Sequence, residues 1–158
     1  MKKIKDYLKQ VLLFIIILLL WLLSGLIFNV NTEFYNLLKL PSFAIEGKYI
    51  SIIWFIIYIL IALSIQIIIN KTNIFKNQDY LFILITNYLS NELFMYFFFR
   101  LMSPLLGLII TTITLVSSFF LIIETKKISR TSSYFLIPYL IYNIYAFILM
   151  SSIYFMNF

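Results

Sequence analysis

The sequence predicts an all-α membrane protein in which five transmembrane helices form one bundle, a single domain over residues 1–158. Hydrophobic residues make up 63% of the chain and charged residues only 11%, and the mean hydropathy is +1.03. A water-soluble globule of this length could not bury so much apolar surface, so most side chains must lie within a lipid bilayer. The few charged residues separate apolar runs that are long enough to cross that bilayer.

The first predicted span is the apolar run at residues 11–28. A lysine-rich segment precedes this run, as in a signal peptide, but the small-residue pattern of a cleavage site is missing. About 18 residues at about 1.5 Å each nearly cover a hydrocarbon core of about 30 Å. We therefore expect a first helix that is retained in the protein.

The loop at residues 29–49 and the span that follows it, residues 50–69, are central to the functional prediction. Gly47 and a proline oppose a continuous helix through the loop. Trp54 and Tyr58 lie four residues apart in the span, so they share one helix face. We expect the loop to fold back over that face as a lid and to close a pocket with three of its own residues, Tyr35, Pro41 and Phe43.

The other spans are predicted at residues 80–99, 105–123 and 133–156. A tight turn separates the third span from the fourth. Pro104 lies at the end of this turn, and proline can open a helix but would break one in its middle. The fourth span is therefore expected to begin directly after it.

The fifth span combines a bend with a notch. Pro138 is expected to kink the helix because it leaves a backbone carbonyl one turn earlier without a partner. Tyr142 and Ala146 lie one turn apart, so a large ring stands beside a small side chain. This notch fits either a ligand contact or ordinary aromatic packing.

The third span carries polar side chains, which lipid penalises unless they pair or face a cavity. Asn87, Asn91 and Phe94 mix amides with a ring on one face, which suits a mostly apolar ligand with a few acceptors. Alternatively, both amides bind neighbouring helices as packing contacts. Glu92 is expected to reach Arg100 or to lie protonated against another helix, and a proton relay is the sharper alternative.

The basic residues predict the orientation in the membrane. Five spans place nine lysine and arginine residues on the side of the N-terminus and three on the other side. This asymmetry predicts a cytoplasmic N-terminus. The high isoleucine, asparagine and lysine content is typical of an AT-rich bacterial genome, so we expect a multi-pass protein of a bacterial plasma membrane. The basic residues occupy short loops rather than one continuous face, so we expect no nucleic-acid partner.

No catalytic or metal-binding arrangement is expected. The chain has no cysteine and no histidine, which removes thiolate chemistry and the commonest general base and metal ligand. Its three glycines are too far apart to form a phosphate-binding loop. The sequence therefore predicts a binding protein that is not an enzyme and requires no cofactor.

One family shares this order of features. The five-span layout with its long first loop resembles the tryptophan-rich sensory protein family, also called the translocator or peripheral benzodiazepine receptor family. The resemblance covers about residues 10–156 and implies a homodimer that binds porphyrins, sterols or benzodiazepine-type ligands beneath the first loop. It rests on the loop FYNLLKLPSF and on Trp54, Tyr58, Asn91, Phe94, Phe98, Phe99, Pro138, Tyr139, Tyr142 and Ala146.

Within this resemblance the chain is poor in tryptophan. Trp54, Asn91 and Ala146 match the family pattern directly, whereas Phe94 and Tyr142 replace family tryptophans. Paired tryptophans carry the light- or oxidant-dependent porphyrin breakdown proposed for some bacterial relatives. The first hypothesis is thus a sensory or regulatory membrane protein that binds a tetrapyrrole or a similar flat hydrophobic molecule. A small transporter of such ligands and a porphyrin-degrading protein are the alternatives.

Overall fold

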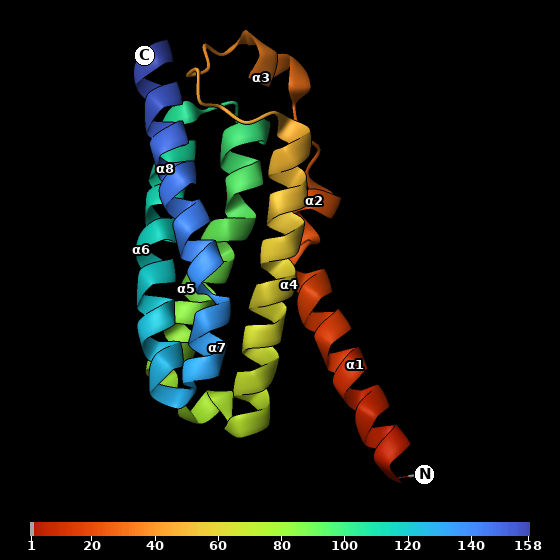
Figure 1. Ribbon diagram of the computed structural model, residues 1–158. Helices are drawn as coiled ribbons and strands as arrows, with labels where there is room; N and C mark the ends of the chain where they lie inside the picture. Colours follow the sequence, from red (N-terminus) through yellow and green to blue (C-terminus); the bar gives the residue numbers. More distant parts are fainter. Residues whose placement is uncertain (1) are drawn as a thin grey trace.

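The computed structural model describes residues 2–158, and this part of the chain is helical with no β-strand. Figure 1 shows an elongated bundle whose long helices run side by side. Four helical segments are long and apolar enough to cross a membrane, as expected for a multi-pass membrane protein. They are Gly47–Lys71, Gln78–Arg100, Pro104–Ile128 and Arg130–Asn157.

Several of these segments are composite. The second changes near its end from an α-helix to a π-helix, and the fourth is divided by one non-helical residue. A short 3-10 helix joins the first segment to the second. The bounds are α4 (Gly47–Lys71), η1 (Ile74–Lys76), α5 (Gln78–Phe94), η2 (Met95–Arg100), α6 (Pro104–Ile128), α7 (Arg130–Phe135) and α8 (Ile137–Asn157).

Both prolines of the later spans lie at helix starts. Pro104 occupies the first turn of α6, and the hydroxyl of Ser103 caps that turn by accepting from the Leu106 N–H at 3.3 Å. Pro138 occupies the first turn of α8, and Leu136, two positions before it, separates α8 from α7. The helix is therefore interrupted at a single residue, because proline cannot donate the hydrogen bond that would continue α7, and Leu136 keeps right-handed helical backbone angles.

The predicted first span is not one continuous helix. α1 (Lys2–Trp21) and the short α2 (Leu23–Ile27) are separated by one residue, Leu22. The first half of α1 carries lysines and an aspartate, so every 18-residue stretch of it contains at least three charged residues and α1 is not counted among the four segments. Figure 1 shows α1 diverging from α4 towards the N-terminus. The count of five membrane helices is thus not confirmed by these segments.

Two side chains of α5 explain the break in the first helix. In an unbroken helix the Ser24 N–H would bond to the Leu20 carbonyl. Instead, Ser24 N–H donates to Glu92 Oε2 at 2.6 Å, and the Tyr88 hydroxyl donates to the Leu20 carbonyl at 3.2 Å. The break thus leaves neither backbone group without a partner.

The loop after the first span covers one end of the bundle (Figure 1). We call residues 29–46 the lid. It contains one short helix, α3 (Thr32–Leu37), whose first turn is capped by Asn31 Oδ1, which accepts from the Phe34 N–H at 2.9 Å. The loop was predicted to end at residue 49, whereas α4 begins at Gly47.

Small and hydroxylated residues allow α6 to pack closely against its neighbours. A Cβ atom at Gly107 would lie 2.8 Å from Met150 Cε and 2.8 Å from Phe98 Cδ2. Thr111 and Thr114 are buried, and each hydroxyl donates to the carbonyl one turn earlier, at 2.8 and 2.9 Å. Such residues are the usual means by which helices approach one another in lipid.

Candidate functional site

A cavity of about 820 Å³ lies beneath the lid, between α2, α4, α5, η2, α6 and α8. Its wall is mostly apolar and aromatic, as in small-molecule sites generally. The structure brings seven of the ten predicted site residues into this wall. They are Tyr35, Trp54, Tyr58, Asn91, Phe94, Tyr142 and Ala146.

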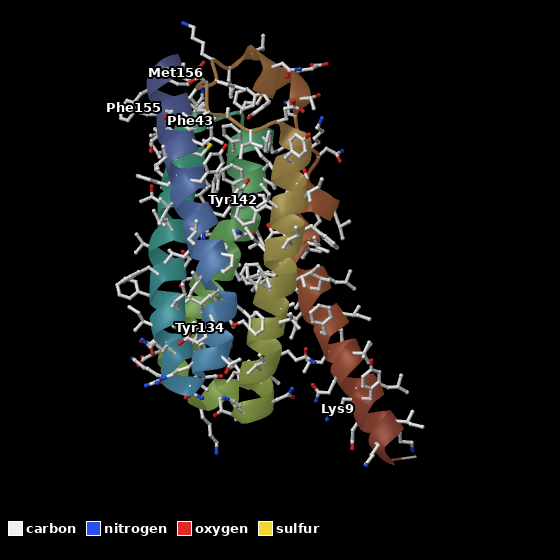
Figure 2. The ribbon with its side chains drawn as sticks, viewed as in Figure 1. Lys9, Phe43, Tyr134, Tyr142, Phe155 and Met156 are labelled. Atoms are coloured by element: carbon white, nitrogen blue, oxygen red, sulfur yellow. The ribbon has the colours of Figure 1, made fainter. Side chains whose placement is uncertain are left out.

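Aromatic rings from α4 and α8 meet at the centre of this wall. The ring of Trp54 lies 5.4 Å from that of Tyr58, as their shared helix face predicts, and 5.2 Å from that of Tyr142. Trp54 and Tyr142 are nearly perpendicular, at 86°. In Figure 2, Tyr142 projects from α8 towards α4. Edge-to-face contacts of this kind hold each ring in one orientation.

The lid is attached to α8 by polar and aromatic contacts. The hydroxyl of Tyr145 accepts from the Ile45 N–H at 3.1 Å, and its ring lies 6.4 Å from that of Phe43. The side chain of Asn157 accepts from the Lys39 N–H at 2.9 Å and donates to the Lys39 carbonyl at 3.0 Å. These bonds join residues about one hundred positions apart in the chain and keep the lid closed over the cavity.

Two predicted lid residues do not line the cavity. Phe43 packs on Tyr145 at the lid end of the bundle (Figure 2) and remains 46% exposed. The carbonyl of Pro41 accepts from the Ala44 N–H at 3.0 Å in a tight turn. Both residues therefore shape and anchor the lid, whereas Tyr35 alone of the three predicted lid residues reaches the cavity.

Tyr35 brings a hydroxyl group to the lid side of the cavity. Its oxygen is buried and has no hydrogen-bond partner. Burial, and then the nearby Tyr145, raise the pKa of Tyr35 above its ordinary value. The hydroxyl therefore stays neutral at physiological pH and retains its proton.

The two asparagines of α5 have different surroundings. Asn91 lines the cavity and accepts from the hydroxyl of Tyr58 at 2.8 Å. Asn87 is fully buried away from the cavity, and its Nδ2 donates to Ser117 Oγ at 2.9 Å and to the Thr114 carbonyl at 3.2 Å. Asn91 Nδ2 also donates to the Tyr139 hydroxyl of α8 at 3.5 Å. Both amides therefore bond to neighbouring helices, as in the packing alternative, and Asn91 in addition lines the cavity.

Glu92 does not pair with Arg100. Its Oε2 atom accepts from the Ser24 N–H at the break between α1 and α2, and its Oε1 atom is buried without a partner. Glu92 therefore lies against another helix, which is the second of the two expected positions. In the described part of the chain, no group of three or more acidic side chains lies close enough together to hold a metal ion.

Sequence reasoning missed Trp21 and the contribution of the first span. Trp21 is 2% exposed, and its ring lies 6.0 Å from that of Tyr58 and 5.4 Å from that of Tyr88. It supports the cavity wall from behind. Its place in the middle of the first apolar run was the available signal, because interfacial tryptophans lie near the ends of spans. Ser24 and Gly25 of α2 line the cavity itself.

Known proteins resemble this chain over most of its length. A model of the TspO/MBR family matches residues 11–156. The chain is 34% identical over 144 residues to an uncharacterized membrane protein, YtaB, of Bacillus subtilis, which covers 91% of this chain and 93% of the relative. It is 31% identical over 138 residues to the tryptophan-rich protein TspO of Bacillus cereus, which covers 87% of this chain and 90% of the relative.

Proposed function

The chain belongs to the TspO/MBR family, and from this premise we propose that it binds a flat hydrophobic molecule of the tetrapyrrole or sterol kind in the cavity beneath its lid. The observation that carries the proposal is an aromatic cavity of about 820 Å³ with Trp54 and Tyr142 in its wall. Cavities that hold drug-sized ligands measure about 300–1,000 Å³.

The chemistry of the wall supports a mostly apolar ligand. Aromatic rings supply large contact areas, and their faces attract flat conjugated or fused-ring molecules. Most polar groups that line the cavity are neutral, including Asn91 and the side chains of Tyr35 and Tyr58. Its two charged residues, Glu46 and Lys48, pair with each other at 2.9 Å. A ligand with a large apolar body and a small number of polar atoms matches this wall.

The proposal includes a topology and an assembly. We place α1 and α2 together as a fifth membrane crossing, since they continue the apolar run at residues 11–28. Nine of the twelve lysines and arginines then lie on the side of the N-terminus, which puts that side in the cytoplasm of a bacterial cell. By resemblance to its family, the protein is proposed to be a homodimer and a sensory or regulatory component of the plasma membrane.

Titration with protoporphyrin IX tests the binding proposal. The purified protein in detergent is expected to show saturable quenching of tryptophan fluorescence. The double variant Trp54→Phe with Tyr142→Ala is expected to bind at least about tenfold more weakly. The contact of the Tyr142 ring, worth about 0.5–1.5 kcal/mol, is lost, and the smaller ring of phenylalanine buries less area than the indole. Trp21 remains in this variant and reports residual binding.

A lipid-facing substitution provides the control. Phe120→Ala removes a ring from the outer face of α6. The side chain of Phe120 is 46% exposed and does not line the cavity. It is expected to leave the protoporphyrin affinity unchanged. Absence of saturable quenching, or equal affinities for the double variant and the unmodified protein, contradicts the proposal.

We propose binding without a chemical step. Phe94 and Tyr142 stand where the family pattern has tryptophans, so the paired indoles associated with porphyrin breakdown are not present at those positions. Under illumination, bound protoporphyrin is expected to lose absorbance no faster than in detergent alone. Faster loss in the presence of protein favours the degradation alternative, and protein-dependent flux of protoporphyrin across proteoliposomes favours the transporter alternative.

A further inference from the structure

A continuous chain of hydrogen bonds leads from the core of α6 to the cavity. It begins at the Thr114 carbonyl and passes through three side chains that are at most 6% exposed. It ends at the hydroxyl of Tyr58, in the cavity wall. The links are Asn87 Nδ2 to the Thr114 carbonyl (3.2 Å), Tyr139 Oη to Asn87 Oδ1 (3.0 Å), Asn91 Nδ2 to Tyr139 Oη (3.5 Å) and Tyr58 Oη to Asn91 Oδ1 (2.8 Å).

The buried end of this chain fixes the direction of every bond. A backbone carbonyl has no proton, so the atom of Asn87 that faces Thr114 must be the amide nitrogen. Ser117 agrees, because its hydroxyl donates to the same carbonyl at 3.1 Å and presents lone pairs to Asn87 Nδ2 at 2.9 Å. Asn87 Oδ1 must therefore face Tyr139.

The donor of each further hydrogen bond then follows from the bond before it. Tyr139 uses its single proton on Asn87 Oδ1, so only lone pairs remain for Asn91. Asn91 consequently turns its Nδ2 towards Tyr139 and its Oδ1 towards Tyr58, and Tyr58 must donate. Asn87 and Tyr139 are at most 1% exposed, so water cannot supply a proton that would reverse the bond between them.

We propose that this chain makes Tyr58 a hydrogen-bond acceptor towards the cavity, so that the site selects ligands with an O–H or N–H group at this position over analogues that can only accept. This inference rests on the proposed function and deepens it. Once the hydroxyl of Tyr58 has donated to Asn91, its oxygen offers only lone pairs. A ligand group that also offers only lone pairs forms no hydrogen bond with Tyr58 and places its lone pairs against those of the Tyr58 oxygen.

A matched pair of fluorescent sterols measures this selectivity. Dehydroergosterol carries a hydroxyl that donates and accepts, whereas its 3-O-methyl ether can only accept. Binding to the full chain in nanodiscs is followed by energy transfer from tryptophan. The unmodified protein is expected to bind the alcohol about tenfold more tightly than the ether, the factor expected for one buried hydrogen bond. Tyr58→Phe is expected to bring the ratio of the two affinities close to one.

Asn87→Leu tests whether the buried hydrogen bonds determine which way the hydroxyl of Tyr58 donates. Asn87 itself does not line the cavity. Without Asn87 Oδ1, the Tyr139 hydroxyl is free to donate to Asn91 Oδ1, and Asn91 then turns its Nδ2 towards Tyr58. The proton of Tyr58 becomes available to the cavity, so the preference for the alcohol is expected to fall at least about fivefold or to reverse. A purely structural role of Asn87 would weaken binding of both sterols equally and leave their ratio unchanged.

Ser64→Ala is the control for removal of a buried polar contact. The Ser64 hydroxyl bonds to that of Ser132 at 2.8 Å, between α4 and α7 and outside the chain described here. This variant is expected to keep the ratio of the unmodified protein. If Asn87→Leu does not fold, the ratio of the two sterol affinities in Tyr58→Phe decides whether the inference holds.

The outcomes separate this inference from the proposed function. If neither sterol nor protoporphyrin IX binds, the proposed function fails and the inference falls with it. If protoporphyrin binds and the unmodified protein either does not bind dehydroergosterol or binds the two sterols equally, the inference alone is overturned. An alcohol preference that persists in Tyr58→Phe, or that is unchanged in Asn87→Leu, also overturns it.

Discussion

Glu92 shows how one side chain compensates for an irregular backbone within a membrane. Lipid offers no hydrogen bonds, so each backbone group freed by the break at Leu22 needs a protein partner. Glu92 supplies the acceptor for Ser24, and Tyr88 supplies the donor for Leu20. Both partners come from α5, so the start of α2 is held against the helix that carries Asn91.

Removal of this carboxylate is expected to loosen α2. Glu92→Ala leaves the Ser24 N–H without its acceptor, and a buried donor left without a partner costs about 1–3 kcal/mol. Hydrogen exchange in residues 22–28, followed by mass spectrometry, is expected to accelerate by about tenfold or more. Glu92→Gln keeps an acceptor oxygen and is expected to restore most of the protection. Equal exchange in Glu92→Ala and the unmodified protein contradicts this role.

At the scale of elements, close packing around α6 determines where the cavity ends. η2 places Phe98 against Gly107, and α8 places Met150 against the same glycine. The π-helical turn carries one extra residue per turn, which shifts Phe98 and Phe99 relative to a regular helix. Both rings line the cavity. The contact at Gly107 therefore fixes one side of the site.

A methyl group at Gly107 is expected to destabilise the bundle. Gly107→Ala places its Cβ 2.8 Å from Met150 Cε and from Phe98 Cδ2. Overpacking of this kind costs about 1–3 kcal/mol, so the midpoint of thermal unfolding in detergent should fall. Gly25→Ala is the matched control, because a Cβ there meets nothing within 4 Å. A Gly107→Ala protein as stable as the control would show that the helices can separate freely.

At the scale of the whole molecule, polar groups lie inside and apolar side chains lie outside. The outer face of α6 exposes Ile113, Val116 and Phe120 by 41%, 50% and 46%, whereas Asn87 and Ser118 are completely buried. This inverts the arrangement of a water-soluble protein and fits a lipid solvent. Figure 1 places the two termini at opposite ends of the molecule.

Labelling of single cysteines tests the proposed topology. The chain has no cysteine of its own, so each introduced thiol is unique. In intact cells, Glu33→Cys in the lid is expected to react with a membrane-impermeant maleimide. Gln78→Cys at the start of α5 is expected to react only after permeabilisation. The reverse pattern would mean that the lid faces the cytoplasm.

The sequence by itself determined the features that depend on local order. Hydropathy adds along each segment, so the four long spans could be recognised without knowledge of their partners. The period of the helix alone places Trp54 and Tyr58 on one face, and their rings lie 5.4 Å apart.

Only the tertiary structure decided which polar side chains face the cavity. Asn87 and Asn91 lie on the same face of α5 and are equivalent by spacing, yet one packs against α6 and the other lines the cavity. Ser24 and Glu92 are 68 positions apart, and their bond explains a break that hydropathy does not predict. A side chain's role here depends on the neighbouring helix that faces it, and that neighbour is set by packing between distant segments, which no local pattern records.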